Sequence, residues 1–131
     1  MAMGNKYGAH RVIEPIGLLP QAAQKIDNTM EIYDNEILID VSALNIDSAS
    51  FRQLWTASKQ DESHLKEMVL EIVNERGKMQ NPVTGSGGML MGSIAKIGSA
   101  LQNRKDIKVG NRIASLVSLS LTPLHIDEIL A

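Results

Sequence analysis

The chain of 131 residues contains no cysteine, and this absence excludes disulfide bonds and any metal site built on thiolates. No apolar run approaches the roughly 18 residues that a membrane-spanning helix needs. The net charge is only −2, so no excess of positive charge favours nucleic acid or an anionic membrane as a partner. The N-terminus also lacks the apolar stretch of a signal peptide. Together these absences predict a cytoplasmic protein with neither nucleic-acid nor membrane partners.

Aromatic residues are also scarce. The chain has one Trp, one Phe and two Tyr, whereas hydrophobic residues as a class make up 44% of it. A chain of this length is large enough to form one domain with a real core. We therefore expect a single domain whose core is built from Ile, Leu, Val and Met.

Alternating hydrophobicity predicts several strands. In the segment 36–42, Ile37, Ile39 and Val41 recur at every second position, so they fall on one face of a strand. Further strands are expected at about 89–97, 111–120 and 124–129. Because strands and helices do not alternate regularly, a doubly wound parallel sheet is disfavoured. The pattern predicts a mainly β fold with a minor helical part.

One segment, 61–76, has a dependable helical period. Its apolar residues follow a spacing of three and four, with Asp61 or Ser63 available as N-cap and Gly77 as the stop signal. A shorter helix over 51–57 is expected to begin after Ser50 as its cap. The fold is therefore mainly β with one long inserted helix.

The glycine-rich loop 84–88 raises the possibility of a phosphate site. Such a site needs a strand before the loop and a helix after it, so that backbone N–H groups meet the anion. Here the predicted helix comes before the loop and the strand after it, which disfavours phosphate binding. Two other interpretations stay open. The loop lets the backbone pass closely over a neighbour, or it lines a substrate pocket to which Thr84 and Ser86 offer hydroxyl groups.

Asp47 lies where the strand 36–42 and its apolar continuation end, among the small polar residues Ser48 and Ser50. Residues that follow strands carry chemistry more often than residues within them. A carboxylate here could accept a proton or hold an ammonium group. It could equally form a turn or cap a helix. The sequence leaves both interpretations open.

Other polar residues have a plainer interpretation. His10, His64 and His125 are far apart in the sequence and are expected to be isolated surface or rim residues, so no metal site is predicted. The acidic residues Glu31, Asp34 and Glu36 are expected to be solvated. Arg52 lies on the short helix and is one of several arginines that could bind a carboxylate.

The chain contains ILIDVSALNID (37–47), Gly92-x-Ile94-x-x-Ile97-Gly98 and VGNRI (109–113), and together these three motifs resemble the catalytic domain of medium-chain dehydrogenases. The segment ILIDVSALNID (37–47) resembles their opening strand. The pattern Gly92-x-Ile94-x-x-Ile97-Gly98 is similar to their Gly-x-Val-x-x-Val-Gly strand, and VGNRI (109–113) resembles their Val-Gly-Asp-Arg-Val turn. This resemblance implies a GroES-like, partly open β-barrel.

A narrower resemblance, over residues 10–131, is to the L-erythro-3,5-diaminohexanoate dehydrogenase family of lysine fermentation. It is carried by HRVIEP (10–15), LPQAAQKIDN (19–28), NEILIDV with LNIDSASF (35–51), NPVTGSGGML (81–90) and VGNRIASLVSLSLTPL (109–124). The chain departs from zinc-dependent relatives. Asp47 stands at or near the position of their first cysteine ligand, and Gly87-Gly88-Met89 replaces their Gly-His-Glu. The resemblance therefore implies a member without zinc.

The resemblance implies an NAD-dependent enzyme that oxidatively deaminates a diamino acid to 5-amino-3-oxohexanoate. The general base would be Asp47, and the substrate would be bound by Ser48, Ser50, Arg52, Thr84 and Ser86. Residues 1–9 would be a flexible N-terminus and 10–131 the substrate domain, without the Rossmann domain that holds NAD. Alone the chain would be inactive, and we expect a homo-oligomer. A non-enzymatic GroES-like binding or assembly module and a zinc-free quinone or enone reductase domain are the alternatives.

Overall fold

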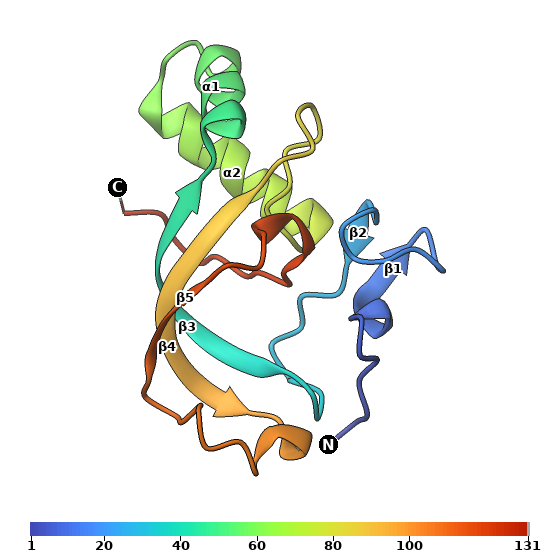
Figure 1. Ribbon diagram of the computed structural model, residues 1–131. Helices are drawn as coiled ribbons and strands as arrows, with labels where there is room; N and C mark the ends of the chain where they lie inside the picture. The colour runs from blue at the N-terminus through green and yellow to red at the C-terminus, as the bar shows by residue number, and fades with distance from the viewer. Residues whose placement is uncertain (131) are drawn as a thin grey trace.

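A computed structural model describes residues 1–130 of the chain, so Ala131, the last residue of the expected substrate domain, lies outside them. The described part is mainly β, with two sheets and two α-helices (Figure 1). The elements in chain order are η1 (Ala9–Arg11), β1 (Val12–Glu14), β2 (Lys25–Ile26), β3 (Ile37–Ile46), α1 (Ser48–Ala57), α2 (Glu62–Arg76), β4 (Gly88–Ile97), η2 (Ser99–Leu101), β5 (Arg112–Ser115) and η3 (Leu119–Leu121).

The larger sheet has the antiparallel order β3-β4-β5, and β1 pairs with β2 in a separate two-stranded sheet. β3 and β4 pair from Ile37 opposite Ile97 to Ile46 opposite Gly88. One glycine is required within this pairing and another just beyond its end. A Cβ on Gly92 would collide with the carbonyl oxygen of Asp40, and one on Gly98 would collide with that of Asp34. The two glycines thus mark places where backbones approach too closely for a side chain.

Both helices begin at an aspartate. Asp61 accepts hydrogen bonds from the backbone N–H groups at the start of α2, and Gly77 ends this helix with a φ of 73°. The long helix expected over 61–76 is thus confirmed. The carboxylate of Asp47 accepts a 2.9 Å hydrogen bond from the N–H of Ser50 and caps α1. The prediction that Ser50 caps the shorter helix was wrong, because the aspartate three residues earlier already accepts from that N–H.

The core lies between the inner face of the β3-β4-β5 sheet and the helices, and it is aliphatic as expected. Its buried side chains are those of Leu54, Val69, Val73, Met79, Leu90, Leu119 and Leu124. Figure 1 shows α1 and α2 gathered toward one end of the sheet. The loop that joins α2 to β4 therefore passes next to the start of α1.

The last part of the chain differs from the prediction. β5 is shorter than the strand expected over 111–120, and no strand forms over 124–129. Ser118 begins a 3-10 turn, and Pro123 offers no N–H group to a sheet. The N–H of Leu124 instead donates to the carbonyl of Gly77, and its carbonyl accepts from Asn28. With these backbone groups bonded elsewhere, the sheets of residues 1–130 do not close into a barrel.

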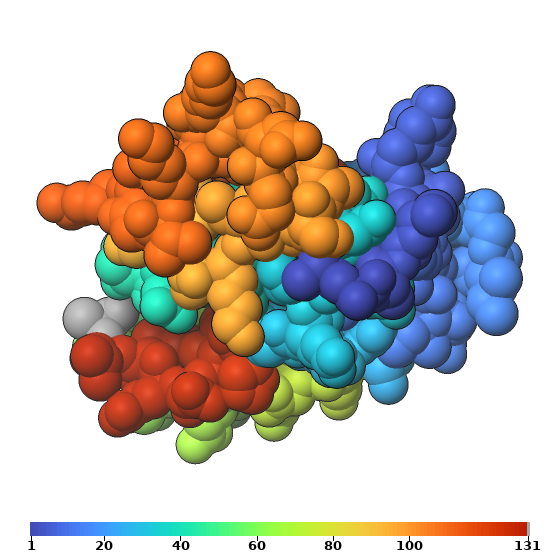
Figure 2. Space-filling view, turned by 90° about the horizontal axis from the view of Figure 1, so that it is seen from below, coloured from blue at the N-terminus to red at the C-terminus, as the bar shows by residue number. Residues whose placement is uncertain are grey.

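The N-terminal residues lie against the segment that leads into β3 (Figure 2). The N–H of Gly4 donates to the carboxylate of Asp34, and the N–H of Asp34 donates to the carbonyl of Ala2, both at 2.8 Å. These two hydrogen bonds connect the N-terminal segment to the rest of the domain. The flexibility expected of residues 1–9 stays a prediction.

Glu36 is at the centre of a polar network and is not solvated as expected. Arg11, which is only 4% exposed, donates to both of its carboxylate oxygens, at 3.0 and 2.7 Å. Burial by itself raises the pKa of Glu36, but hydrogen bonds from Arg11, the Tyr33 N–H and His10 outweigh it and lower the pKa to about 2. The carboxylate therefore stays ionised and ties η1 to the start of β3.

Candidate functional site

Ser50, Thr84 and Ser86 form a cluster of three hydroxyl groups where α1 meets the loop between α2 and β4. The Ser50 Oγ lies 2.8 Å from the Ser86 Oγ and 3.2 Å from the Thr84 Oγ1, and the latter two oxygens are 2.7 Å apart. Ser50 is fully buried, whereas Thr84 is exposed. The cluster thus runs from the interior to the surface. The sequence interpretation had placed these three residues in one pocket, and the structure brings them together.

Asp47 joins the same two segments. It follows β3 directly and caps α1 through the N–H of Ser50. Its own N–H donates a 3.0 Å hydrogen bond to the carbonyl of Gly87, at the end of the glycine-rich loop. Of the two interpretations of Asp47, the helix cap is therefore present. The capping Asp47 remains half-exposed next to Ser50, so capping is compatible with a second role as a proton acceptor or as a group that binds an ammonium.

Ser48 and Arg52 lie apart from the cluster. Ser48 is the exposed first residue of α1. Arg52 follows Ser50 by two positions, which turns its side chain by roughly 200° around the helix axis. It lines an open hollow of about 540 Å³ along α1, together with Ala49, Gln53, Thr56 and Ala57. The roles predicted for Ser48 and Arg52 stay predictions.

Asn81 and Gln53 are polar residues of this region that the sequence interpretation missed. The side-chain N–H of Asn81 donates to the side-chain oxygen of Gln53 at 2.8 Å. The one available signal was the Asn81-Pro82 pair, which is typical of the start of a turn. Gln53 had no signal, since only the tertiary contact distinguishes it from other polar helix residues.

The loop does not fit the phosphates of a dinucleotide. Its N–H groups are used within the loop itself, since Gly85 donates to the carbonyl of Asn81 and Ser86 to the hydroxyl of Thr84. A strand follows it where a phosphate site needs the N-terminus of a helix. Gly87 fits the interpretation that the loop backbone passes closely over a neighbouring segment, since a Cβ there would lie within 3 Å of the Ser120 N and the Met79 O.

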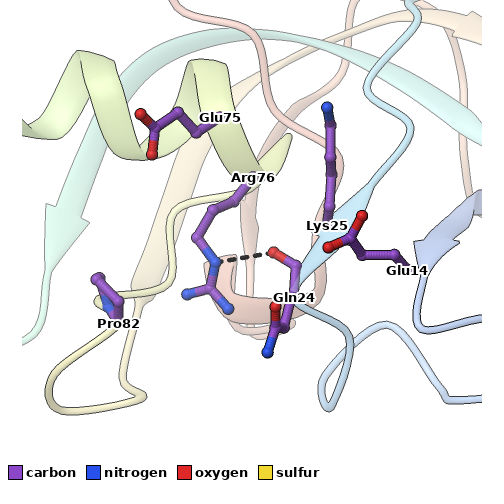
Figure 3. A pocket seen from close by; sticks show the side chains of 6 residues that line it. All are labelled: Glu14, Gln24, Lys25, Glu75, Arg76 and Pro82. Carbon is purple, nitrogen blue, oxygen red and sulfur yellow. Dashed lines mark hydrogen bonds between the residues drawn. The ribbon is translucent and has the colours of Figure 1, made fainter.

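A second hollow, of about 420 Å³, lies between β1, β2 and the end of α2 (Figure 3). It is lined by Glu14, Gln24, Lys25, Glu75, Arg76 and Pro82. Arg76 spans it with a 2.9 Å hydrogen bond from Nε to the carbonyl of Gln24. None of the residues predicted to bind substrate lines this hollow.

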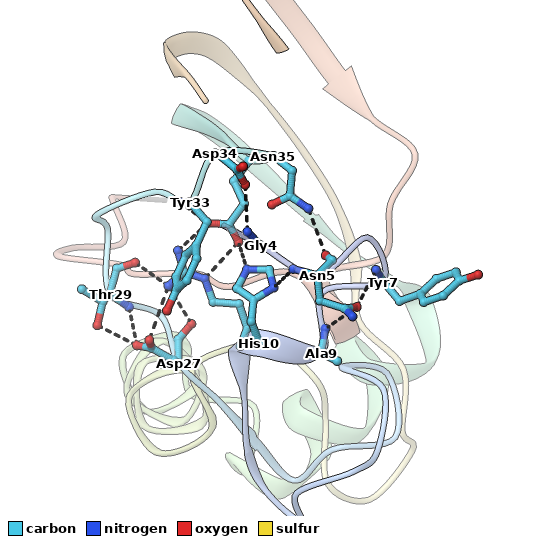
Figure 4. Close-up of polar contacts among 12 residues, drawn as sticks. Gly4, Asn5, Tyr7, Ala9, His10, Asp27, Thr29, Tyr33, Asp34 and Asn35 are labelled. Carbon is cyan, nitrogen blue, oxygen red and sulfur yellow. Dashed lines mark hydrogen bonds and ion pairs between the residues drawn. The ribbon is translucent and has the colours of Figure 1, made fainter. Parts of the chain in front are cut away.

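The histidines are not all isolated, contrary to expectation. The His10 ring accepts from the N–H of Asn5 through Nδ1 and faces the Glu36 carboxylate at 3.0 Å through Nε2 (Figure 4). His125 pairs with Asp127 at the surface. Across residues 1–130, no three His, Asp or Glu side chains gather at distances that would hold a metal ion. No helix in that part of the chain has the length and apolar character to cross a membrane.

The sequence of this chain matches one family over residues 10–131, described as the L-erythro-3,5-diaminohexanoate dehydrogenase N-terminal domain. A curated relative named L-erythro-3,5-diaminohexanoate dehydrogenase, from Fusobacterium nucleatum, is 65% identical over 99% of this chain. A relative of the same name from Acetoanaerobium sticklandii is 65% identical over 97% of it. The chain spans only 38% and 37% of the lengths of these two relatives. The chain therefore belongs to the family of L-erythro-3,5-diaminohexanoate dehydrogenase N-terminal domains.

Proposed function

We propose that this chain forms the substrate-binding part of an enzyme that oxidises L-erythro-3,5-diaminohexanoate to 5-amino-3-oxohexanoate with NAD. Overall, the ammonium-bearing carbon gives a hydride to NAD⁺, and water replaces nitrogen at that carbon. The products are the ketone, NADH, NH₄⁺ and one proton. The observation that carries the proposal is the 65% identity to two dehydrogenases of that name. Because the loop 84–88 does not suit a dinucleotide, the proposal assigns NAD to residues outside this chain.

The chemistry of the substrate explains why a polar site is needed. An ammonium group must lose a proton before its carbon can give up a hydride, so a base has to stand beside the reacting carbon. The substrate also carries a second ammonium group and a carboxylate. In the proposal, Asp47 accepts the proton, and Thr84 and Ser86 accept hydrogen bonds from an ammonium group, while the buried Ser50 takes part in the site through its hydrogen bonds to both. Ser48 and Arg52 would complete the pocket, with Arg52 on the carboxylate.

The polar lining also distinguishes this proposal from its alternatives. A quinone or enone reductase would need an apolar pocket, whereas here three hydroxyl groups meet and a carboxylate caps the helix that bears one of them. A binding or assembly module would have no need of an amino-acid substrate at all. The hydroxyl cluster therefore supports the amine dehydrogenase.

The test is an assay of the full-length protein with NAD and 3,5-diaminohexanoate, and in parallel with simple alcohols. We expect reduction of NAD with the diamino acid alone. Asp47→Asn keeps an equally good helix cap but removes the base, so kcat should fall by about a hundredfold or more. Activity with alcohols only would reject the proposal. An unchanged rate across pH in Asp47→Asn would assign the base to another residue.

A further inference from the structure

Asn81 is a fully buried polar residue whose backbone and side chain are all bonded within the site region. Its N–H donates to the carbonyl of Ser86 at 2.9 Å, and its carbonyl accepts from Gly85 at 2.7 Å. Its side-chain oxygen accepts from the N–H groups of Val83 at 2.8 Å and Thr84 at 3.4 Å. Asn81 thus sets the backbone path of the loop that carries two of the three hydroxyl groups.

The other end of the same side chain reaches α1. The Nδ2 of Asn81 donates to the Oε1 of Gln53 at 2.8 Å. Gln53 lies three residues after Ser50 on that helix, so the two side chains are neighbours on its surface. One carboxamide group therefore connects the loop that bears Thr84 and Ser86 with the helix that bears Ser50.

Apolar packing contributes little to this loop. At its tip Val83 is 70% exposed, and Thr84 and Gly85 are exposed as well. Since few side chains of the loop tip enter the core, hydrogen bonds have to determine where its hydroxyl groups stand. Asn81 takes part in five of them, as many as Ser86 does.

We infer that Asn81, together with Gln53, is a positioning residue for the substrate, because it sets the spacing of the Ser50, Thr84 and Ser86 hydroxyl groups. The inference rests on the proposed function and extends it to two residues that would not touch the substrate themselves. The three hydroxyl groups bond to one another at 2.7–3.2 Å, so their spacing decides in which directions their remaining lone pairs face an ammonium group. A small shift between α1 and the loop would change these directions without unfolding the domain.

Gln53→Leu is the main test, because it removes the contact between helix and loop at a half-buried position and leaves the bonds of Asn81 within the loop. In the full-length protein we expect about a tenfold rise in KM for 3,5-diaminohexanoate, as for one lost hydrogen bond, with kcat within about twofold. Calorimetric titration with the diamino acid should show a matching rise in Kd. Gln102→Leu is the matched control, since Gln102 donates to the carbonyl of Ile97, on a different part of the chain. It should leave both constants unchanged.

A double-mutant cycle separates positioning from a general structural effect. If Gln53 acts through the hydroxyl cluster, Gln53→Leu should have no further effect on KM in a Ser50→Ala background. Additive effects on KM would overturn the inference. Asn81→Ser keeps a hydroxyl for the loop N–H groups but cannot reach Gln53, so it should reproduce the change in KM.

The same experiment distinguishes a failure of the proposed function from a failure of the inference about Asn81 and Gln53. If the unsubstituted protein neither binds nor oxidises the diamino acid, the proposed function falls and the inference falls with it. If it does both, and Gln53→Leu has the constants of the unsubstituted protein, only the inference is overturned. Should Asn81→Ser fail to fold, Gln53→Leu alone still decides.

Discussion

The ammonium group of Lys78 donates a 2.6 Å hydrogen bond to the backbone carbonyl of Pro20, and Lys78 is fully buried. A second, longer bond goes to the carbonyl of Gln21. None of the ion pairs within residues 1–130 includes this lysine. Burial, with a smaller contribution from the charge of Arg76, lowers the pKa of Lys78 to about 8. The lysine holds the segment before β2 against the end of α2, although burying its charge opposes folding.

Because of Lys78, the free energy of unfolding should rise as the pH increases from about 8 to 10.5. In the unfolded chain a lysine stays protonated up to its ordinary pKa of 10.5, whereas folded Lys78 loses its proton from about pH 8. The folded state thus binds fewer protons in this window, and the free energy of unfolding should rise by on the order of 3 kcal/mol across it. Urea unfolding at several pH values measures this slope. Lys78→Met should flatten it, and exposed Lys105→Met should not. Equal slopes in all three proteins would contradict the prediction.

Glu36 should stabilise the chain at neutral pH and lose this effect in acid. Because its pKa is lowered from 4.5 to about 2, the stabilisation is complete above about pH 4.5 and is lost as pH falls toward 2. The shift corresponds to on the order of 3 kcal/mol. Glu36→Gln should therefore reduce the difference in unfolding free energy between the two ends of this window. Glu71→Gln, at an exposed position of α2, is the control and should leave that difference unchanged. An unaltered acid profile in Glu36→Gln would show that Arg11 does not stabilise the ionised carboxylate.

Gly92→Ala should disrupt the central sheet. The new Cβ would overlap the carbonyl of Asp40 on the paired strand, and neither backbone can move without breaking the ladder. We expect a loss of about 3 kcal/mol or more in unfolding free energy. At Gly17 a Cβ would meet nothing, although the φ of 98° strains any other residue. Gly17→Ala should therefore cost only about 1 kcal/mol. Similar losses for the two variants would argue against the close approach of β3 and β4.

Asp47 can be tested as a helix cap separately from its proposed role as a base. Asp47→Ala removes the acceptor for the N–H of Ser50 and should cost about 1 kcal/mol. Asp47→Asn keeps the acceptor and should unfold at the same urea concentration as the unsubstituted chain. The two variants are compared by circular dichroism during urea unfolding. If both lose the same stability, the carboxylate charge stabilises α1 and the capping bond is secondary.

The helices and strands that were predicted correctly are those determined by residues close together in the sequence. The helix over 61–76 forms because its apolar spacing, its aspartate cap and its final glycine agree. The strand over 89–97 forms because its alternation gives the sheet one apolar face, whereas the expected alternation over 36–42 breaks where the register shifts between Val41 and Ala43, which leaves Val41 exposed. The strand expected over 124–129 does not form, because Leu124 bonds to Gly77 and Asn28 in place of a neighbouring strand. Hydrophobic alternation alone could not reveal those two partners.

The candidate site also has some features that the sequence predicts and others that depend on tertiary contacts. The sequence by itself determined the family, the aliphatic core, and the small polar residues at the end of β3 and in the glycine-rich loop. Only the tertiary structure decided that Ser50 meets Thr84 and Ser86, and that Asn81 joins the two segments through Gln53. The physical reason is the distance along the chain. Helix periods and caps depend on neighbours within a few residues, whereas the contact between Ser50 and Ser86 depends on how α1 and α2 pack against one sheet.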